Sequence, residues 1–366
     1  MKESIIERNA RLGVDRMIAD FKVKQKQPYE FKVRYAERRA WEFVEECGRR
    51  DLNTHTSVGG LDSITLHCFL RSIGIDIPAV SASVLEDKSI QAVHKQLGVE
   101  GVKPLKNKVV VIREFGFPIL SKEIAGKIEL LQNPTEKNAT VRHAIITGET
   151  GEYGGNRTGT RMQLPRKWLE RFGGADQEGR ACGYRAAPFK VSEKCCYYLK
   201  EKPCDDWAKE HNSVPFLGLM ASEGGRREKA LMMHGCNYFG ETTIRSAPFA
   251  IFDRQDILRL ALDLDVPVPE IYGRIVREPS GTLRTTKAQR TGCSMCGFGI
   301  HLDKRPHTFD LLYERNPQEW EFWMNKVGWG EVLDYIGVEW RQTERQMSFI
   351  DAVDSMYPDA RREAAK

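Results

Sequence analysis

From about residue 51 onward, short apolar runs alternate with helical stretches, and this alternation constrains the fold more than any other feature of the sequence. The stretches in order are Ile64–Ile73, Ile77–Val84, Ser89–Leu97, Val109–Ile112, a helix over Ser121–Leu131, a strand over Val214–Met220 and a helix over Asp253–Leu264. Such alternation is typical of βαβ units, in which parallel strands are joined by crossover helices. The sequence therefore predicts an α/β fold, with a mostly parallel sheet that carries helices on both faces.

The size and charge of the chain suit a protein of about two domains. It has 366 residues, and a domain averages about 150 residues. Residues 1–50 read as an amphipathic helical extension that packs on the body or forms an oligomer contact, such as that of a homodimer. Residues 51–275 carry the α/β domain, and residues 276–366 are expected to form a helical, cysteine-containing C-terminal region. Lys and Arg number 56 against 51 Asp and Glu, which permits an anionic substrate or nucleic acid without requiring one.

The sequence argues against membrane insertion and export. No run approaches the ~18 apolar residues of a membrane span, and charged residues throughout the N-terminal stretch exclude a signal peptide. The expectation is a cytoplasmic protein whose nine cysteines stay mostly reduced. In that compartment, close cysteine pairs point to metal or redox chemistry before disulfides.

A glycine pair opens the first helix of the α/β segment. The stretch Ser57-Val58-Gly59-Gly60-Leu61-Asp62-Ser63 precedes the helix-like run ITLHCFLRSIG. Paired glycines let the backbone approach an anion, and a helix N-terminus presents free N–H groups and a positive dipole end. Ser63 can hydrogen-bond a phosphate, while Asp62 can cap the turn or help to hold Mg²⁺. The pattern predicts a phosphate loop, with an ordinary turn as the alternative.

The strand expected over Ile77–Val84 ends in polar side chains. Ser81 and Ser83 lie at its end, and Glu86 follows. Because ligands bind at the carboxyl ends of parallel strands, these residues are candidates for contacts to the adenine and ribose of a nucleotide. Ordinary polar residues at a strand end are the alternative.

Two cysteine pairs are the second informative feature. Cys195 and Cys196 are adjacent on a short helix that Pro203 is expected to end, and Cys293 and Cys296 form a CxxC between glycines. Four thiolates can ligate zinc or a 4Fe–4S cluster. Neighbouring helical side chains point about 100° apart, which favours a cluster over tetrahedral zinc. Zinc and unligated thiols remain the alternatives.

These motifs together resemble a known family. The glycine loop resembles the SGGxDS loop of the PP-loop ATP pyrophosphatases, or adenine nucleotide α-hydrolases. The CC…CxxC order resembles the 4Fe–4S branch of the phosphoadenosine phosphosulfate (PAPS) reductase family, as do the words KVSEKCCYYLKEKP, PFLGLMASEGGRRE and SAPFAIFDRQDILRLALDLDVPVPEIYG. The resemblance covers the chain from about Ser57 to the cysteine-rich segment and extends to the Dnd-type DNA phosphorothioation enzymes.

The resemblance implies a Rossmann-like parallel sheet, a bound adenine nucleotide (ATP, PAPS or adenylyl sulfate, APS) and a 4Fe–4S cluster on the four cysteines. The nucleotide contacts that it implies are Ser57, Gly59, Gly60, Asp62, Ser63, Ser81, Ser83, Glu86, Ser222, Glu223 and Arg226. For the last three, a solvated surface helix is the alternative. The candidate catalytic residues are Asp62, Ser63, Lys122 and Arg226, of which Lys122 is chosen because it lies in a polar stretch between apolar runs.

Three departures from the family pattern bear on the reaction. Val58 replaces the first Ser of the loop, Leu61 stands where many members carry Lys, and no Cys follows Cys296. Sulfonucleotide reductases use a C-terminal Cys as nucleophile, so its absence favours the thiolation branch. There, ATP adenylates an oxygen of the acceptor, pyrophosphate leaves, and cluster-bound sulfur displaces AMP. The implied partners are a nucleic acid (DNA or tRNA) and a sulfur donor such as a cysteine desulfurase. The alternatives are a PAPS or APS reductase that releases sulfite and a non-catalytic nucleotide-binding partner in a larger assembly.

Basic residues surround the cysteines. Lys190, Lys194, Arg290 and Lys304 flank the two pairs, and residues 276–292 are polar and basic and should form an exposed excursion. Such charge can attract phosphates and support a nucleic-acid surface, although a solvated polar loop is the commoner fate of exposed charge.

Overall fold

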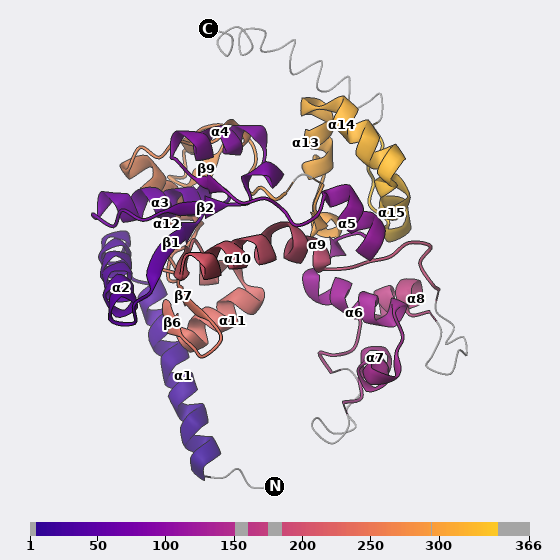
Figure 1. Cartoon of the computed structure of the whole chain (residues 1–366), viewed down its shortest axis with the longest axis horizontal. Coiled ribbons are helices and arrows are strands. Elements are labelled where there is room, and N and C mark those ends of the chain that lie inside the picture. Colours follow the sequence, from indigo (N-terminus) through magenta and orange to yellow (C-terminus); the bar gives the residue numbers. More distant parts are fainter. Residues whose placement is uncertain (1–4, 151–159, 175–184, 294, 343–366) are drawn as a thin grey trace, which may run out of the picture. The chain divides into compact units, whose positions relative to one another are not determined.

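The computed structural model describes residues 5–150, 160–174, 185–293 and 295–342, which are drawn as ribbon in Figure 1. Contacts divide the chain into two compact units. Unit 1 comprises Met1–Asn107 and Cys196–Ser294, and unit 2 comprises Lys108–Cys195 and Met295–Lys366. The chain therefore passes between the units three times, and two of these passages fall at the cysteine pairs.

Unit 1 contains a sheet of six strands in the order β3-β2-β1-β5-β7-β6. The strands are β1 (Asn53–Ser57), β2 (Ala79–Ser81), β3 (Glu100–Gly101), β5 (Ser213–Leu217), β6 (Asn237–Phe239) and β7 (Ile244–Ser246). All neighbouring pairs are parallel except β6 with β7, which are antiparallel. The prediction of an α/β fold with a mostly parallel sheet is confirmed.

The helices of unit 1 alternate with these strands as the sequence predicts. They are α1 (Ile5–Gln25), α2 (Tyr29–Arg49), α3 (Leu61–Ser72), α4 (Lys88–Gln96), α10 (Lys202–Glu210), α11 (Gly225–His234) and α12 (Arg254–Asp263), with short turns η1 (Ser83–Leu85), η5 (Ala221–Glu223) and η6 (Glu270–Tyr272). At the start of α12, a capping box explains why the sequence predicts a helix boundary at Asp253. Asp253 accepts hydrogen bonds from the N–H groups of Gln255 and Asp256, and Asp256 accepts one from the N–H of Asp253.

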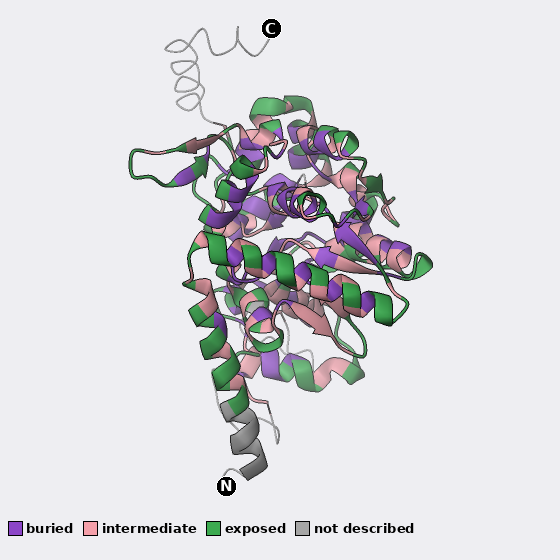
Figure 2. Ribbon diagram, turned by 90° about the vertical axis from the view of Figure 1, so that its left-hand side faces the viewer, coloured by how far each residue is buried: buried purple, intermediate pink, exposed green. Residues whose placement is uncertain are grey.

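The N-terminal helices belong to the core of unit 1. On α2, Ala36, Ala40 and Phe43 are fully buried and join a cluster with α3 and α12. Figure 2 shows such buried positions alternating with exposed ones along the helices. Lys32, only 5% exposed, donates to Asp256 at 2.7 Å, so an ion pair also ties α2 to the start of α12. The predicted helical extension is thus helical over Ile5–Gln25 and Tyr29–Arg49.

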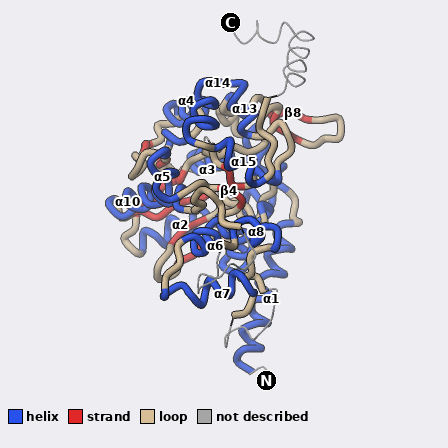
Figure 3. The backbone as a smooth tube through the Cα atoms, turned by 90° about the vertical axis from the view of Figure 1, so that its right-hand side faces the viewer, coloured by secondary structure: helices blue, strands red, loops and turns tan. Residues whose placement is uncertain are grey.

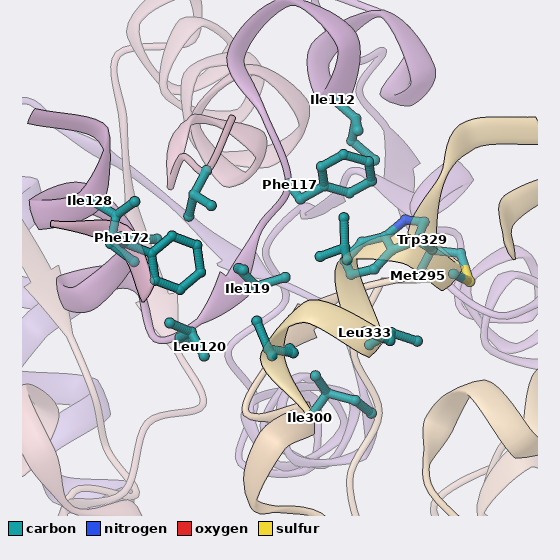
Figure 4. Packing of buried hydrophobic residues seen from close by; sticks show 14 of the residues in the cluster. Ile112, Phe117, Ile119, Leu120, Ile128, Phe172, Met295, Ile300, Trp329 and Leu333 are labelled. Carbon is teal, nitrogen blue, oxygen red and sulfur yellow. The ribbon is translucent and has the colours of Figure 1, made fainter. Parts of the chain in front are cut away.

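Unit 2 is mainly helical and has its own core. Its elements include α5 (Lys108–Phe115), β4 (Ile119–Leu120), α6 (Lys122–Gln132), α7 (Ala139–Thr147), α8 (Arg166–Phe172), β10 (Gly297–Phe298), α13 (Thr308–Arg315), α14 (Pro317–Glu321), η8 (Phe322–Val327) and α15 (Trp329–Ile336). Trp329 is fully buried, and its ring meets those of Phe117 and Phe309 edge-on with centroids 5.2 Å apart. Figure 4 shows this cluster, which draws on both chain segments of the unit.

Several details differ from the sequence-based expectations. The apolar run Val109–Ile112, which the alternation assigns to a strand, lies in α5, because its apolar residues pack on the core of unit 2 rather than in the sheet. The segment predicted as one domain, residues 51–275, is divided between the units, since Lys108–Cys195 packs with the C-terminal tryptophans. Residues 276–292, expected to form an exposed excursion, are mostly exposed or half-buried and include most of a hairpin of β8 (Ile275–Arg277) and β9 (Leu283–Thr285). The loops expected at 148–163 and 173–183 fall partly outside the described residues, as the end of the chain does wholly.

The helix that carries Cys195 and Cys196 does not end at Pro203. It begins as α9 (Lys194–Cys196), passes through a π-helical turn, η4 (Tyr197–Glu201), and continues as α10. The wider turn lets a new helical segment start at Lys202, where Pro203 occupies the first turn and its missing N–H is not needed.

Candidate functional site

The carboxyl ends of β1, β2 and β5 meet at one edge of the unit 1 sheet. From β1, the sheet grows through β2 in one direction and through β5 in the other. Ligands of open α/β sheets bind outside the carboxyl ends of the strands at such a reversal of strand order. The segments that leave the three strands here begin at Val58, Ala82 and Gly218. They contain most of the predicted nucleotide contacts.

The glycine loop joins β1 to α3 with Gly60 as the residue before the helix. The Ser63 hydroxyl accepts a hydrogen bond from the Gly59 N–H at 2.7 Å and donates one to the Gly60 carbonyl at 2.9 Å. The predicted phosphate ligand Ser63 therefore also holds the loop in shape. The tyrosine hydroxyl of Tyr272 accepts a hydrogen bond from the Leu61 N–H at 3.1 Å, which adds a contact from a distant segment.

Two glycines are required by close packing, and one is not. A Cβ on Gly60 would overlap the Tyr272 hydroxyl, and a Cβ on Gly218 would lie 3.0 Å from the Ser63 Cα. A Cβ on Gly59 would meet only side-chain oxygens of Glu86 and Ser63, at 3.7 and 3.8 Å. Packing within the protein therefore does not require glycine at position 59, whereas the close approach of an anion to the backbone would.

Asp62 forms an ion pair with Arg254, the first residue of α12. Burial raises the pKa of Asp62, the Arg254 guanidinium lowers it, and nearby Glu223 raises it further, so that the net shift is upward. Arg254 also donates to the Gln289 carbonyl at 3.0 Å, and Arg290 acts on Asp62 through its charge. Asp62 therefore serves first as the partner of Arg254 in this structure, and the two arginines place positive charge beside the loop.

His94 on α4 joins the ends of β1 and β2. Its Nε2 lies 2.8 Å from the Gly59 carbonyl oxygen and its Nδ1 lies 2.8 Å from the Ser83 hydroxyl. Because a carbonyl can only accept, Nε2 carries the proton and Nδ1 accepts from Ser83. Burial lowers the pKa of His94, which suits this neutral tautomer. The predicted contact Ser83 is thus engaged with His94, one of the residues that the sequence reasoning missed.

Glu86, Lys200 and Cys293 form a connected polar group next to Gly59. Lys200 forms an ion pair with Glu86, whose side chain is only 4% exposed, and it also hydrogen-bonds the sulfur of Cys293. Burial lowers the pKa of Lys200, but attraction to Cys293 and Glu86 outweighs it, so the net pKa is raised. Contacts within unit 1 therefore connect the glycine loop, through Glu86 and Lys200, to one cysteine of the CxxC.

The remaining predicted nucleotide contacts differ in position. Ser81 is buried within β2, and Ser57 at the end of β1 is half-buried. Ser222 is exposed and donates to the Phe252 carbonyl at 3.1 Å, while Glu223 pairs with Arg227 at 2.8 Å. Arg226 lies in the first turn of α11, but its side chain is outside the described part of the structure. Lys122 starts α6 of unit 2 and therefore does not belong to the unit that contains the loop.

The four predicted metal ligands are divided between the units. Cys196 and Cys293 belong to unit 1, and Cys195 and Cys296 belong to unit 2. None of the cysteines that the structure describes belongs to a disulfide. Among the described residues, no three His, Cys, Asp or Glu side chains gather closely enough to hold a metal ion. The ligand set itself therefore stays a prediction from the sequence.

The sequence reasoning missed the residues that hold the loop from a distance, namely His94, Lys200, Arg254, Tyr272 and Thr291. Two of them have a sequence signal. His94 follows Ile90 and Val93 at helical spacing, so it occupies a position on an apolar face. Lys200 follows Cys196 by four residues, about one helical turn. Arg254, Tyr272 and Thr291 carry no such signal, because nothing in their local sequence points to residues 60–62.

Comparison with protein-family models, curated proteins and solved structures finds no match to this chain. No helix in the described ranges is both long and apolar enough to cross a bilayer.

Proposed function

We propose that this chain is a PP-loop enzyme of the PAPS reductase type, with a Rossmann-like adenine nucleotide α-hydrolase sheet. It binds ATP through Ser57–Ser63 and transfers sulfur to a nucleic acid, DNA or tRNA, by way of adenylation. The observation that carries the proposal is the place of the glycine loop, which leaves β1 where the strand order reverses and opens α3. Backbone N–H groups and a helix dipole at that place suit a polyphosphate. The reaction class rests on the sequence resemblance.

The residues around the loop have separate tasks in this proposal. Gly59, which has no side chain, lets the phosphates approach the loop backbone, while His94 and Tyr272 hydrogen-bond the loop backbone. Arg254 and Arg290 supply positive charge near the phosphates, where negative charge builds up as pyrophosphate leaves. In the first step an acceptor oxygen attacks the α-phosphorus of ATP and pyrophosphate departs. In the second step a sulfur nucleophile displaces AMP from the acceptor.

The proposed cofactor is a 4Fe–4S cluster on Cys195, Cys196, Cys293 and Cys296. The donor chemistry fits, because four cysteine sulfurs are the usual ligands of such a cluster, none of the four is in a disulfide, and Lys200 donates to the Cys293 sulfur. When bound, such a cluster supplies an iron site that can carry the sulfur to be transferred. The chain's own contribution is to hold Cys293 next to Lys200 and Glu86, within the same unit as the nucleotide loop.

The first test is ATP binding by isothermal titration calorimetry with Gly59→Ala. The added methyl group makes only ordinary contacts with Glu86 and Ser63, so the fold should survive while the close approach of a phosphate is blocked. We expect at least a tenfold loss of ATP affinity, about 1.4 kcal/mol. Gly48→Ala is the matched control, since a Cβ there meets nothing within 4 Å. Equal ATP affinity of both variants and the wild type would refute the loop assignment.

The second test concerns the reaction. Pyrophosphate release from ATP that depends on an added nucleic acid and a sulfur donor, such as a cysteine desulfurase, supports thiolation. Thiol-dependent sulfite release from PAPS or APS would instead identify a sulfonucleotide reductase. ATP binding without either reaction would leave a non-catalytic nucleotide-binding partner as the function.

A further inference from the structure

The hairpin of β8 and β9 begins and ends at the phosphate loop. At its base, the Tyr272 hydroxyl hydrogen-bonds the Thr291 hydroxyl at 2.6 Å and accepts from the Leu61 N–H. Backbone hydrogen bonds then pair the two arms from Ile271 with Ala288 up to the turn at Glu278. The hairpin carries the label β8 in Figure 3, where its two arms run out to a turn. The hairpin is therefore an arm whose base is part of the candidate nucleotide site.

A side chain of α12 holds the hairpin in place. The Gln255 amide donates to the Leu283 carbonyl at 2.9 Å and accepts from the Leu283 N–H at 2.7 Å. The Gln255 side chain thus satisfies both backbone hydrogen-bonding groups of Leu283, as a neighbouring β-strand would. The preceding residue, Arg254, pairs with Asp62 of the loop and donates to Gln289 at the hairpin base. One turn of α12 consequently fixes both the loop and the arm.

The two faces of the hairpin differ in character. Leu283 and Thr285 are 5% and 0% exposed, and Arg284 between them is exposed. Since side chains alternate along a strand, Arg284 faces away from α12, on the same side as its partner Val276. One face of β9, with Leu283 and Thr285, is therefore buried. The other face carries Arg284, which is exposed to solvent.

The arm carries an excess of positive charge. Between Glu270 and Thr291 the acidic residues are Glu270 and Glu278, and the basic residues are Arg274, Arg277, Arg284, Lys287 and Arg290, all five exposed. Glu278 pairs with Arg284 at 2.6 Å and Glu270 with Lys287 at 3.4 Å. Exposed pairs of this kind contribute little to stability, so a phosphate can replace either carboxylate. Within the described residues, neither Arg274 nor Arg277 has an acidic partner at ion-pair distance.

We propose that the β8–β9 hairpin binds the phosphate backbone of double-stranded DNA and presents the DNA to the nucleotide site at its base. The proposal rests on the proposed function, for which it specifies the acceptor. A two-stranded ribbon fits the major groove of B-form DNA, about 12 Å wide. The major groove of an RNA duplex is deep and narrow and does not admit it. Arginines on the arm contact phosphates as the ribbon enters the groove.

The test is fluorescence anisotropy with a labelled DNA duplex of about 20 base pairs, since binding of this kind is sequence-independent. The variant Arg274→Gln, Arg277→Gln, Arg284→Gln removes three positive charges outside the nucleotide site. At about 100 mM salt we expect at least a tenfold weaker affinity, and a salt dependence flatter by about 0.9 for each lost phosphate contact. ATP affinity should be unchanged, because none of the three side chains reaches the loop residues.

Two control variants separate charge from folding. The triple Lys variant at the same three positions should retain DNA binding, because lysine also neutralises phosphates. Arg38→Gln with Arg49→Gln removes two charges from α2 whose side chains are also exposed (65% and 70%) and should leave binding intact. No DNA binding by the wild-type chain, tighter binding to an RNA duplex of the same sequence, or equal binding by the triple Gln variant would each overturn the proposal.

The outcomes also distinguish this proposal from the proposed function. If Gly59→Ala lowers ATP affinity while the triple Gln variant still binds DNA as the wild type does, the hairpin assignment fails and the nucleotide site stands. If DNA binding depends on the arginines but no ATP is bound, the proposed function fails and the DNA-binding arm stands.

Discussion

The contact between Gly60 and Tyr272 can be tested by a pair of substitutions that are each harmful alone. In the structure a Cβ on Gly60 overlaps the Tyr272 hydroxyl oxygen, whereas the next atom of that side chain, Cζ, lies 3.6 Å away at ordinary contact distance. Tyr272→Phe removes the overlapping atom and leaves the ring. The double variant Gly60→Ala, Tyr272→Phe should therefore fit where Gly60→Ala alone does not.

The magnitudes follow from the contacts. Gly60→Ala overpacks a site fixed by the hairpin base, which costs about 2 kcal/mol. Tyr272→Phe deletes the hydrogen bonds with Leu61 and Thr291, which costs about 1–2 kcal/mol. If the costs were independent, the double variant would lose about 3–4 kcal/mol. Because the clash disappears with the hydroxyl, we expect a loss of only about 1–2 kcal/mol, a coupling of about 2 kcal/mol. Thr291, 3.0 Å from the added Cβ, must give slightly and limits the recovery.

The assay is urea unfolding of the four proteins at pH 7, with hydrogen exchange of the Leu61 amide as a local probe. The exchange measurement matters because the chain has two compact units, and a global transition need not report on the loop. Gly60→Ala should speed exchange of the Leu61 amide. Adding Tyr272→Phe to Gly60→Ala should speed that exchange by less than Tyr272→Phe does in the wild-type background. Strictly additive losses in the double variant would refute the placement of Tyr272 against Gly60, and with it the attachment of the hairpin to the loop.

Three further predictions follow from buried charged and titratable groups. Burial, aided by His211, lowers the pKa of His55 to about 4, so between pH 6.5 and 4 the unfolded chain takes up a proton that the folded chain does not. The free energy of unfolding should fall across that window by about 3 kcal/mol, and His55→Asn should flatten the pH dependence; an unchanged curve would contradict the assignment. Lys200→Met leaves the carboxylate of Glu86 buried without its partner and should cost about 3 kcal/mol in urea unfolding, most of which a second change, Glu86→Gln, should restore. Cys293→Ser should remove most of the iron and sulfide from anaerobically purified protein while Cys68→Ser keeps it; equal iron in both would count against Cys293 as a ligand.

Local sequence predicts helix starts well where the capping contacts lie within a few residues of the boundary. The capping box at Asp253 and the N-cap Ser121, whose hydroxyl accepts from the Ile124 N–H, mark helix starts through contacts only three residues away. The glycine pair at the start of α3 was likewise recognisable, because its geometry depends on its own backbone. The run Val109–Ile112 was misassigned because a short apolar stretch suits a strand and a buried helix equally well.

The surroundings of the loop were not predictable in the same way. His94 and Tyr272 reach the loop across 35 and 211 residues of sequence, and Arg254 reaches Asp62 across 192. Such contacts depend on the order in which the strands pair, which places β2 and β5 on either side of β1. Local periodicity carries no information on that order. The partners of Asp62, Ser83 and Glu86 therefore had to come from the tertiary structure.

The sequence alone determined that this chain alternates strands and helices, that a glycine loop opens the first helix after β1, and that cysteines stand in two close pairs. Those features depend on residues adjacent in the chain, whose hydrogen bonds and side-chain periodicity are local. Only the tertiary structure decided that Lys108–Cys195 leaves the sheet domain for a second core around Trp329. It also decided that Tyr272 and Arg254 fasten a basic hairpin to the glycine loop and that Gln255 fastens the same hairpin to α12. Packing joins these distant segments because each has an apolar face to bury, and burial is a property of the whole fold.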